Sequence, residues 1–321
     1  MRNRLLVAVC VLVLLLLPYA VYPVLAMKVL CFALFACAFN LLIGYTGLLS
    51  FGHAAFFGAA AYTTGYAIQT LGLSTEIALL LGMLVGGLLG LVMGVLAIRR
   101  QGIYFSMITL ALAQMWYFVC LRLPQTGGED GLQGVARGTF LGLIDLSRDI
   151  SLYYVVLAIT VAGFFLIVRI VHSPYGQVLK AIKDNEPRAI SLGYDVNRYK
   201  LLAFVLSASL AGLAGAAKTV VLGFATLSDV HWSLSGLVIL MTLVGGIETM
   251  EGPIVGAILV LFLENKLGDL GNWLSMTTHV EWFSTLGESV SLVTGVIFIG
   301  CVLMFRRGIV GEIIARVNRN A

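Results

Sequence analysis

The chain has 321 residues, of which 60% are hydrophobic and only 11% charged, and its mean hydropathy is +1.00. Soluble domains carry roughly 25% charged residues, so this composition excludes a water-soluble globular protein. Long apolar runs recur along the chain, and several approach the roughly 20 residues that cross a bilayer as a helix. A transmembrane β-barrel is disfavoured, because its strands are short and alternate in polarity. The formal net charge of +4 predicts no nucleic-acid partner.

The apolar runs predict an all-α fold, a polytopic transmembrane helix bundle of about ten spans, with eight if the short eighth and ninth spans do not cross fully. The predicted spans are residues 5–22, 25–44, 53–71, 76–98, 103–122, 152–171, 201–224, 233–247, 253–270 and 289–305. The first run imitates a secretory signal sequence. A second apolar run follows at once, which favours a helical hairpin with its turn at Pro18 and Pro23.

Lysine and arginine predict the orientation, because short cytoplasmic loops carry an excess of both. The loop 172–200 holds five of them, whereas the other long loop, 123–151, holds two. Residues 172–200 are therefore expected on the cytoplasmic side and 123–151 on the outer side. Four arginines follow the last span, so both termini are expected in the cytoplasm.

Small residues recur at a four-residue spacing in two of the predicted spans. The first strip consists of Gly82, Gly86, Gly90 and Gly94. In the seventh predicted span, Ser207, Ala211 and Gly215 repeat the spacing, and a second strip of Ala208, Gly212 and Ala216 runs beside them. Strips of small residues let two helices approach closely in lipid. We therefore expect a tightly packed bundle.

The sequence predicts no enzyme. A near match to a nucleotide-binding loop occurs at 212–219, but Ala217 replaces a required glycine and the stretch lies in an apolar helix. The four histidines are scattered, no catalytic motif is present, and the five cysteines lie inside apolar runs. We expect no catalytic residue, no metal site and no cofactor in this chain.

The loop 172–200 predicts two short helices. Pro174 suits the start of the first, Asp184 or Asn185 can cap the second, and Gly193 suits its C-terminal end. From spacing alone, a docking helix and an ordinary solvated loop fit this stretch equally well.

Five stretches, which together extend over nearly the whole chain, carry a family resemblance. They are GLLSFGHAAFFGAAAY at 47–62, GIYFSMITLALAQ at 102–114, TGGEDGLQG at 126–134, SPYGQVLKAIKDNEPRAISLGYDVNRYKLLAFVLSASLAGLAGA at 173–216 and GGIETMEGPIVGA at 245–257. These stretches resemble the M-type permease subunits of ABC importers for branched-chain amino acids.

The resemblance implies a single permease domain, 1–321, in the bacterial inner (cytoplasmic) membrane, with loop 123–151 in the periplasm. It implies three kinds of partner besides the lipid bilayer: a second, related permease subunit of the LivH type, two ABC ATPase subunits that bind ATP and Mg, and a periplasmic substrate-binding protein. Glu248 and Glu251 stand where such permeases usually have glycine or an uncharged residue, so the role of this turn stays open.

By position, the resemblance also implies a coupling helix that seats in a groove of an ATPase subunit. Its residues are Glu186, Pro187, Arg188, Ala189, Ile190, Ser191, Leu192 and Gly193.

The stretch GYTGLLSFGHAAFFG at 44–58 holds four glycines between two apolar runs. Each glycine costs about 1 kcal/mol relative to alanine inside a helix, and non-helical backbone at membrane depth requires protein or a water-filled cavity around it. We therefore predict that 44–52 is a broken or re-entrant segment beside the translocation pathway; close helix packing is the alternative. The candidate pathway residues are Gly47, Ser50, Phe51, Gly52 and His53.

Further candidates lie towards the outer side. Ionisable residues within spans are functional candidates by default, although snorkelling explains Lys218 equally well. These charged candidates are Lys218, Asp229 and His231. A glycine-rich part of the periplasmic loop is expected to bend to admit cargo or to touch the binding protein. Its candidates are Thr126, Gly127, Gly128 and Gly131.

The sequence thus predicts half of a translocation pathway for amino acids, with branched-chain cargo (Leu, Ile, Val) expected and ATP hydrolysed by other chains. Similar permeases import urea, short amides or small aromatic acids, and nothing in the sequence decides between these cargoes. A secondary transporter or channel independent of ATPases is an alternative of a different class. Acids at mid-membrane would be expected for it, and the long predicted spans have none.

Overall fold

The computed structural model describes residues 14–19, 21–142, 144–278, 295–296, 298–300 and 308–319. Within them the fold is mostly helical, as predicted. The helices are α2 (Pro23–Thr46), α3 (His53–Gln69), α4 (Thr75–Ala97), α5 (Ile103–Arg122), α6 (Asp149–Val171), α7 (Pro174–Asp184), α8 (Glu186–Ser191), α9 (Val196–Leu222), α10 (Trp232–Gly245), α11 (Gly252–Thr278) and α13 (Gly308–Arg319). The short elements are η1 (Pro124–Thr126), η2 (Leu227–Asp229), β1 (Leu132–Gln133), β2 (Thr139–Phe140), β3 (Ile144–Asp145) and β4 (Phe224–Ala225).

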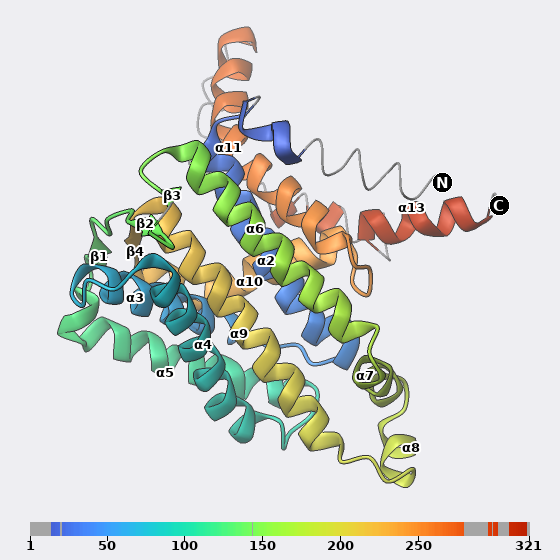
Figure 1. Ribbon diagram of the computed structural model, residues 1–321. Helices are drawn as coiled ribbons and strands as arrows, with labels where there is room; N and C mark the ends of the chain where they lie inside the picture. The colour runs from blue at the N-terminus through green and yellow to red at the C-terminus, as the bar shows by residue number, and fades with distance from the viewer. Residues whose placement is uncertain are drawn as a thin grey trace. The chain divides into compact units, whose positions relative to one another are not determined.

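The chain forms two compact units, residues 1–236 and 237–321. Figure 1 shows the first unit as a bundle in which the long helices α2, α4, α6 and α9 run beside one another. The sites discussed below all lie in this first unit.

Within the described residues, five helices are long and apolar enough to cross a membrane: α2, α4, α5, α6 and α9. The protein is therefore a multi-pass membrane protein. Helix α3, with 17 residues, and α10, with 14, are shorter. The predicted span 289–305 and most of the span 5–22 lie outside the described residues.

Helix α9 is the centre of the first unit and packs against α2, α3 and α4. The glycine strip of α4 faces the second strip of small residues on α9, as its spacing indicates. A Cβ at Gly86 would stand 3.0 Å from the Cα of Gly212, and a Cβ at Gly90 would meet the side chain of Ala208. The two helices can approach this closely only because neither carries bulk at the contact.

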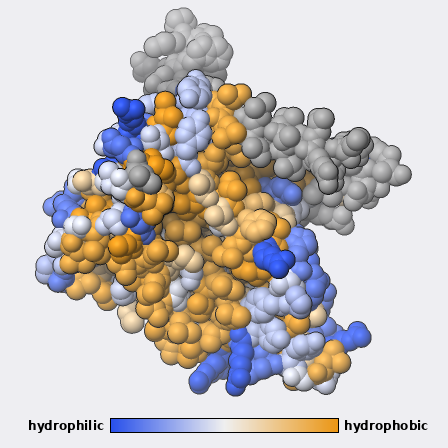
Figure 2. All heavy atoms as spheres, in the orientation of Figure 1, coloured by the Kyte–Doolittle hydropathy of each residue, from blue (hydrophilic) through white to orange (hydrophobic). Residues whose placement is uncertain are grey.

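Apolar side chains also cover the outside of the bundle. Figure 2 shows hydrophobic residues over the long helices of the first unit, and hydrophilic residues over α7 and α8 at the lower right. On α5, the exposed side chains include Tyr104, Met107, Met115 and Phe118. An apolar exterior of this kind suits a lipid environment.

The loop 123–151 is joined to the segment after α9 by short antiparallel pairing. Strand β1 pairs with β4, which sets Leu132 opposite Ala225, and β2 pairs with β3. Gly131, with φ +70°, would place a Cβ against the carbonyl oxygen of Ala225, so the two segments meet only because this residue is glycine.

Three helix boundaries differ from the prediction by three residues or more. Helix α11 ends at Thr278, eight residues after the predicted end at 270. Helix α9 begins at Val196, five residues before the predicted start at 201, because the Asp195 side chain accepts a hydrogen bond from the N–H of Arg198 and caps the helix. Helix α6 begins at Asp149, so part of the predicted outer loop is helical.

In the second unit, the turn between α10 and α11 is tight. A Cβ at Gly256 would meet the carbonyl oxygen of Met241, and one at Gly252 would meet the side chain of Thr249. Glu248 in this turn has φ +72°, a left-handed conformation that favours glycine.

Candidate coupling and pathway sites

A break in the helix is present as predicted, but it spans 47–52 and not 44–52, because residues 44–46 still belong to α2. Helix α2 ends at Thr46, and Gly47 caps it in the left-handed conformation, with φ +73° and its N–H donating to the carbonyl oxygen of Ile43 at 3.2 Å. The chain is then non-helical until α3 begins at His53. We call residues 47–52 the re-entrant segment.

The re-entrant segment turns back into the bundle alongside α5. Ser106 Oγ donates to the carbonyl oxygen of Leu49 at 2.6 Å, and the N–H of Phe51 donates to Thr109 Oγ1 at 3.2 Å. Ser106 and Thr109 lie one and two turns inside α5. Side chains of a neighbouring helix thus satisfy the non-helical backbone, as a segment at membrane depth requires.

His53 begins α3 in the interior of the bundle and is fully buried. Its Nε2 lies 2.8 Å from Ser207 Oγ on α9, and Ser207 Oγ lies 2.5 Å from the carbonyl oxygen of Ala38 on α2. A carbonyl cannot donate, so the single hydroxyl proton of Ser207 goes to Ala38, and His53 must donate from Nε2. The histidine, in its Nε2–H form, thereby ties together α2, α3 and α9.

The surroundings of His53 are aromatic. Its ring makes edge-to-face contacts with Phe39, Phe56 and Phe204, with centroids 5.0 to 6.0 Å apart. Its Nδ1 has no hydrogen-bond partner among the residues that the structure describes. Ser207, 154 residues away, was not among the predicted site residues, and no local sequence pattern links it to His53.

The other predicted pathway residues differ in exposure. Gly47 is exposed and Phe51 half-buried, whereas Ser50 and Gly52 are buried, with Ser50 Oγ accepting from the N–H of Gly52 at 3.1 Å. Four of the five predicted residues lie in the re-entrant segment, and His53 begins α3. Their contact with cargo stays a prediction.

The loop 172–200 folds into the two helices that were predicted. Ser173 Oγ accepts from the N–H of Gly176 at 3.3 Å to cap α7, and Asn185 Oδ1 accepts from the N–H of Arg188 at 3.0 Å to cap α8. Gly193, with φ +89°, follows α8 as expected. We call α7 and α8 together the coupling unit.

The coupling unit has a small core of its own. Ile182, Ala189 and Val196 are buried against one another, and the Tyr175 ring stacks on Tyr199 with centroids 5.6 Å apart. The Tyr175 hydroxyl donates to the carbonyl oxygen of Tyr199 at 2.8 Å, and burial raises the pKa of this phenol. These contacts fix α7 and α8 to the start of α9.

Glu186, the first residue of α8, is a polar centre of this region. One carboxylate oxygen accepts from Lys200 Nζ on α9 at 2.7 Å, and the other accepts from Gln101 Nε2 in the α4–α5 turn at 2.9 Å. Lys200 is only 6% exposed, so the pair is well shielded from water. Glu186 was among the residues predicted from the sequence, but its partners Lys200 and Gln101 were not.

The remaining residues of the predicted coupling helix fall into two groups. Ala189 points inward and is buried, whereas Ile190 and Leu192 are 57% and 69% exposed. Pro187, Arg188, Ser191 and Gly193 are exposed as well. Ile190 lies in the last turn of α8 and Leu192 directly follows this helix, and two large apolar side chains exposed so close together offer a contact to another protein.

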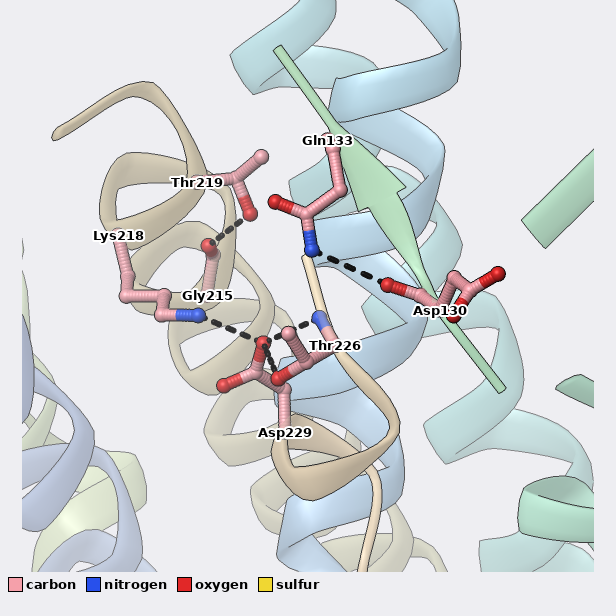
Figure 3. A network of polar contacts seen from close by, with 7 residues as sticks. All are labelled: Asp130, Gln133, Gly215, Lys218, Thr219, Thr226 and Asp229. Atoms are coloured by element: carbon pink, nitrogen blue, oxygen red, sulfur yellow. Dashed lines mark hydrogen bonds and ion pairs between the residues drawn. The ribbon is translucent and has the colours of Figure 1, made fainter. Parts of the chain in front are cut away.

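At the other end of the bundle, Lys218 and Asp229 form a buried ion pair (Figure 3). Lys218 Nζ lies 2.6 Å from Asp229 Oδ2, and the two side chains are 5% and 8% exposed. The same oxygen accepts from the N–H of Thr226 at 2.9 Å, and Lys218 Nζ lies 4.6 Å from the centre of the Phe224 ring. Lys218 is thus paired inside the protein, and the snorkelling interpretation is wrong.

The third charged candidate lies apart from this pair. His231 Nδ1 lies 2.8 Å from Ser233 Oγ, and its ring contacts Tyr117 and Trp232. The four candidates of the outer loop are held by backbone geometry: Thr126 Oγ1 donates to the carbonyl oxygen of Leu123 at 2.7 Å, and Gly127, Gly128 and Gly131 all have positive φ.

Comparisons with known proteins agree with this architecture. A family model described as "Branched-chain amino acid transport system / permease component" matches residues 24–305. The chain is 27% identical over 258 residues to the high-affinity branched-chain amino acid transport system permease protein LivM of Salmonella typhimurium, which covers 73% of this chain and 60% of that protein. The Escherichia coli LivM protein matches with the same identity and coverage. The chain therefore spans about 60% of the length of these curated relatives.

Other relatives carry different names. The autoinducer 2 import system permease protein LsrC of Klebsiella pneumoniae is 28% identical over 194 residues, 57% of this chain and 53% of that protein. The ribose import permease protein RbsC of Haemophilus influenzae is 26% identical over 212 residues, 62% of each chain. Among solved structures, PsaBC from Streptococcus pneumoniae in complex with Fab matches at 15% identity, over 87% of this chain and 89% of the PsaBC chain. The TM-score of 0.41 is too low for this match to support an argument.

Proposed function

Because the chain belongs to the family of permease components of branched-chain amino acid transport systems, we propose that it is the M-type permease subunit of an ATP-driven importer. In this proposal it forms half of a translocation pathway in the bacterial inner membrane, and a second permease of the LivH type forms the other half. Two ABC ATPase subunits supply the energy, and a periplasmic binding protein delivers the cargo.

One observation supports the proposal above the others: the coupling unit presents exposed apolar side chains at the end of a rigid, polar support. Ile190 on α8 and Leu192 directly after it are exposed, while Glu186 ties α8 to α9 through Lys200 and to the α4–α5 turn through Gln101. An ATPase that seats on α8 would therefore act on two spans at once.

Branched-chain amino acids are the proposed cargo, because the LivM proteins of Salmonella typhimurium and Escherichia coli match over 73% of this chain, against 57% for LsrC and 62% for RbsC. Import of a sugar or a sugar-like molecule is the second candidate. The matches to the ribose and autoinducer 2 permeases favour it, since they lie in the same identity range.

The test is ATP-driven uptake of radiolabelled leucine by proteoliposomes that contain the full importer, with ribose as the competing cargo. Ile190→Glu should abolish uptake while the complex still assembles, because a charge is placed in the apolar contact with the ATPase. The matched control is Ile144→Glu, the same substitution at an exposed isoleucine of the outer loop, which should leave uptake unchanged.

Leucine uptake by this chain alone, without ATP or ATPase subunits, would establish a secondary carrier and refute the proposal. Uptake of ribose in place of leucine would refute the cargo assignment while leaving the ATP-driven mechanism in place.

A further inference from the structure

Helix α7 holds the last turn of α2 with two lysines. Lys183 Nζ donates to the carbonyl oxygen of Gly44 at 2.8 Å, and Lys180 Nζ lies 5.6 Å from the centre of the Tyr45 ring. The lysines are three residues apart and so lie on one face of α7. Figure 1 shows α7 beside the lower end of α2, where this turn lies.

The carbonyl of Gly44 is an acceptor that α2 does not satisfy by itself. The last four carbonyls of a helix lack an intrahelical donor, and the N–H of Leu48, four residues further on, instead donates to Thr46 Oγ1 at 3.4 Å. An ammonium group is doubly suited to this place, because the C-terminus of a helix carries partial negative charge. Lys183 thus completes the end of α2 from a position 139 residues away in the chain.

The same lysine lies against the point where the chain leaves α2. A Cβ on Gly47 would lie 3.4 Å from Lys183 Cγ, and the backbone of Gly47 is left-handed, with φ +73°. At Gly47 the chain reverses into the re-entrant segment, whose far end at His53 is tied to α9. Hinges are made of a few residues at element ends that absorb a change in φ and ψ, and Gly47 has that place and that freedom.

We propose that Lys183 is a positioning residue that transmits movement of the coupling unit to the re-entrant segment through the end of α2. The coupling unit moves as one body with the start of α9, because Ile182 of α7, Ala189 of α8 and Val196 of α9 share one buried cluster. A displacement of α8 by a bound ATPase therefore displaces Lys183, and Lys183 carries Gly44 and the hinge at Gly47 with it. This inference rests on the proposed function, since it takes α8 as the ATPase contact.

Two measurements on the full importer complex test the inference. Hydrogen exchange of the peptide that contains residues 44–52 is compared between the nucleotide-free complex and the complex trapped with ATP and vanadate. Leucine moved per ATP hydrolysed is measured in proteoliposomes. The wild type should show a nucleotide-dependent change in exchange at 47–52.

Lys183→Met should abolish that change and lower the leucine moved per ATP about tenfold, the low end of what a hydrogen bond to a charged group contributes, while ATP hydrolysis persists. Lys183→Arg, which keeps the charge and the donors, should restore both. The matched control is Arg198→Met, at the same end of the bundle, where the arginine is 86% exposed and pairs with Asp195 of the preceding turn; it should behave as the wild type.

The inference is overturned if Lys183→Met keeps the nucleotide-dependent exchange, or if the wild type shows none at 47–52. If Lys183→Met does not assemble, Lys183→Gln decides, because it keeps a shorter polar donor without the charge, and wild-type behaviour in that variant also overturns the inference. If the wild-type complex moves no leucine, but Lys183→Met still removes the nucleotide-dependent change in exchange, the proposed cargo is refuted and the role of Lys183 stands.

Discussion

The buried pair of Lys218 and Asp229 allows a prediction with a defined magnitude. Lys218→Met removes the ammonium group and keeps most of the apolar stem, so the packing of α9 is preserved. The Asp229 carboxylate, 8% exposed, is then left in the interior without its counter-charge. Breaking a buried pair by removing one partner costs about 3–5 kcal/mol.

Two hydrogen bonds from Thr226 to Asp229 Oδ2 remain after that substitution, so the lower part of this range applies. We expect Lys218→Met to lower the free energy of unfolding by about 3 kcal/mol. Asp229→Asn should cost a similar amount, because it strands the ammonium group. The double variant should cost less than the sum of the two, since neither charge is left alone.

The assay is equilibrium unfolding by denaturant in detergent micelles, analysed as a double-mutant cycle. The control is Arg198→Met, whose ion pair with Asp195 is exposed and should contribute less than about 1 kcal/mol. If Lys218→Met costs no more than Arg198→Met, and the cycle gives strict additivity, then water reaches the pair and the argument from burial is refuted.

Three further predictions concern other parts of the chain. Ser207→Ala leaves the buried Nε2–H of His53 without an acceptor and should cost about 1–3 kcal/mol of unfolding free energy. The control Ser209→Ala loses a hydrogen bond to Val205 of its own helix and should cost under about 1 kcal/mol. Equal losses in the two variants would contradict the role given to Ser207. Glu248→Gly should raise the unfolding free energy by about 1 kcal/mol by relieving left-handed strain, and a loss of stability in this variant would show that the glutamate side chain matters more than its backbone. The N–H of Ser147 donates to the Asp145 carboxylate at 2.9 Å and lowers the pKa of that carboxyl. The resulting stabilisation is present above the ordinary pKa of aspartate and is lost as the pH falls through the lowered value. Asp145→Asn should therefore reduce the drop in melting temperature between pH 6 and pH 3, and an unchanged drop would contradict the assignment.

Much of this architecture follows from local sequence. Apolar runs of sufficient length specify membrane helices, since every backbone group must be satisfied within the segment. The strip of glycines on α4 and the small residues on α9 indicate a close contact by their spacing alone, and the structure joins these two strips. The break after Thr46 and the caps at Asn185 and Gly193 are also local, because glycine and asparagine act on the backbone within one or two residues.

The partners of the polar side chains were decided by tertiary structure. Lys183 contacts Gly44, His53 contacts Ser207 and Glu186 contacts Gln101 across separations of 85 to 154 residues. No period in the sequence encodes such pairs, because each depends on which helices lie side by side and at what height. Lys218 shows the difference most clearly: the sequence places a charge in an apolar helix, and only the fold of the segment after α9 brings Asp229 to it. Burial makes that pairing necessary, since a lone charge in an apolar interior costs far more than a paired one.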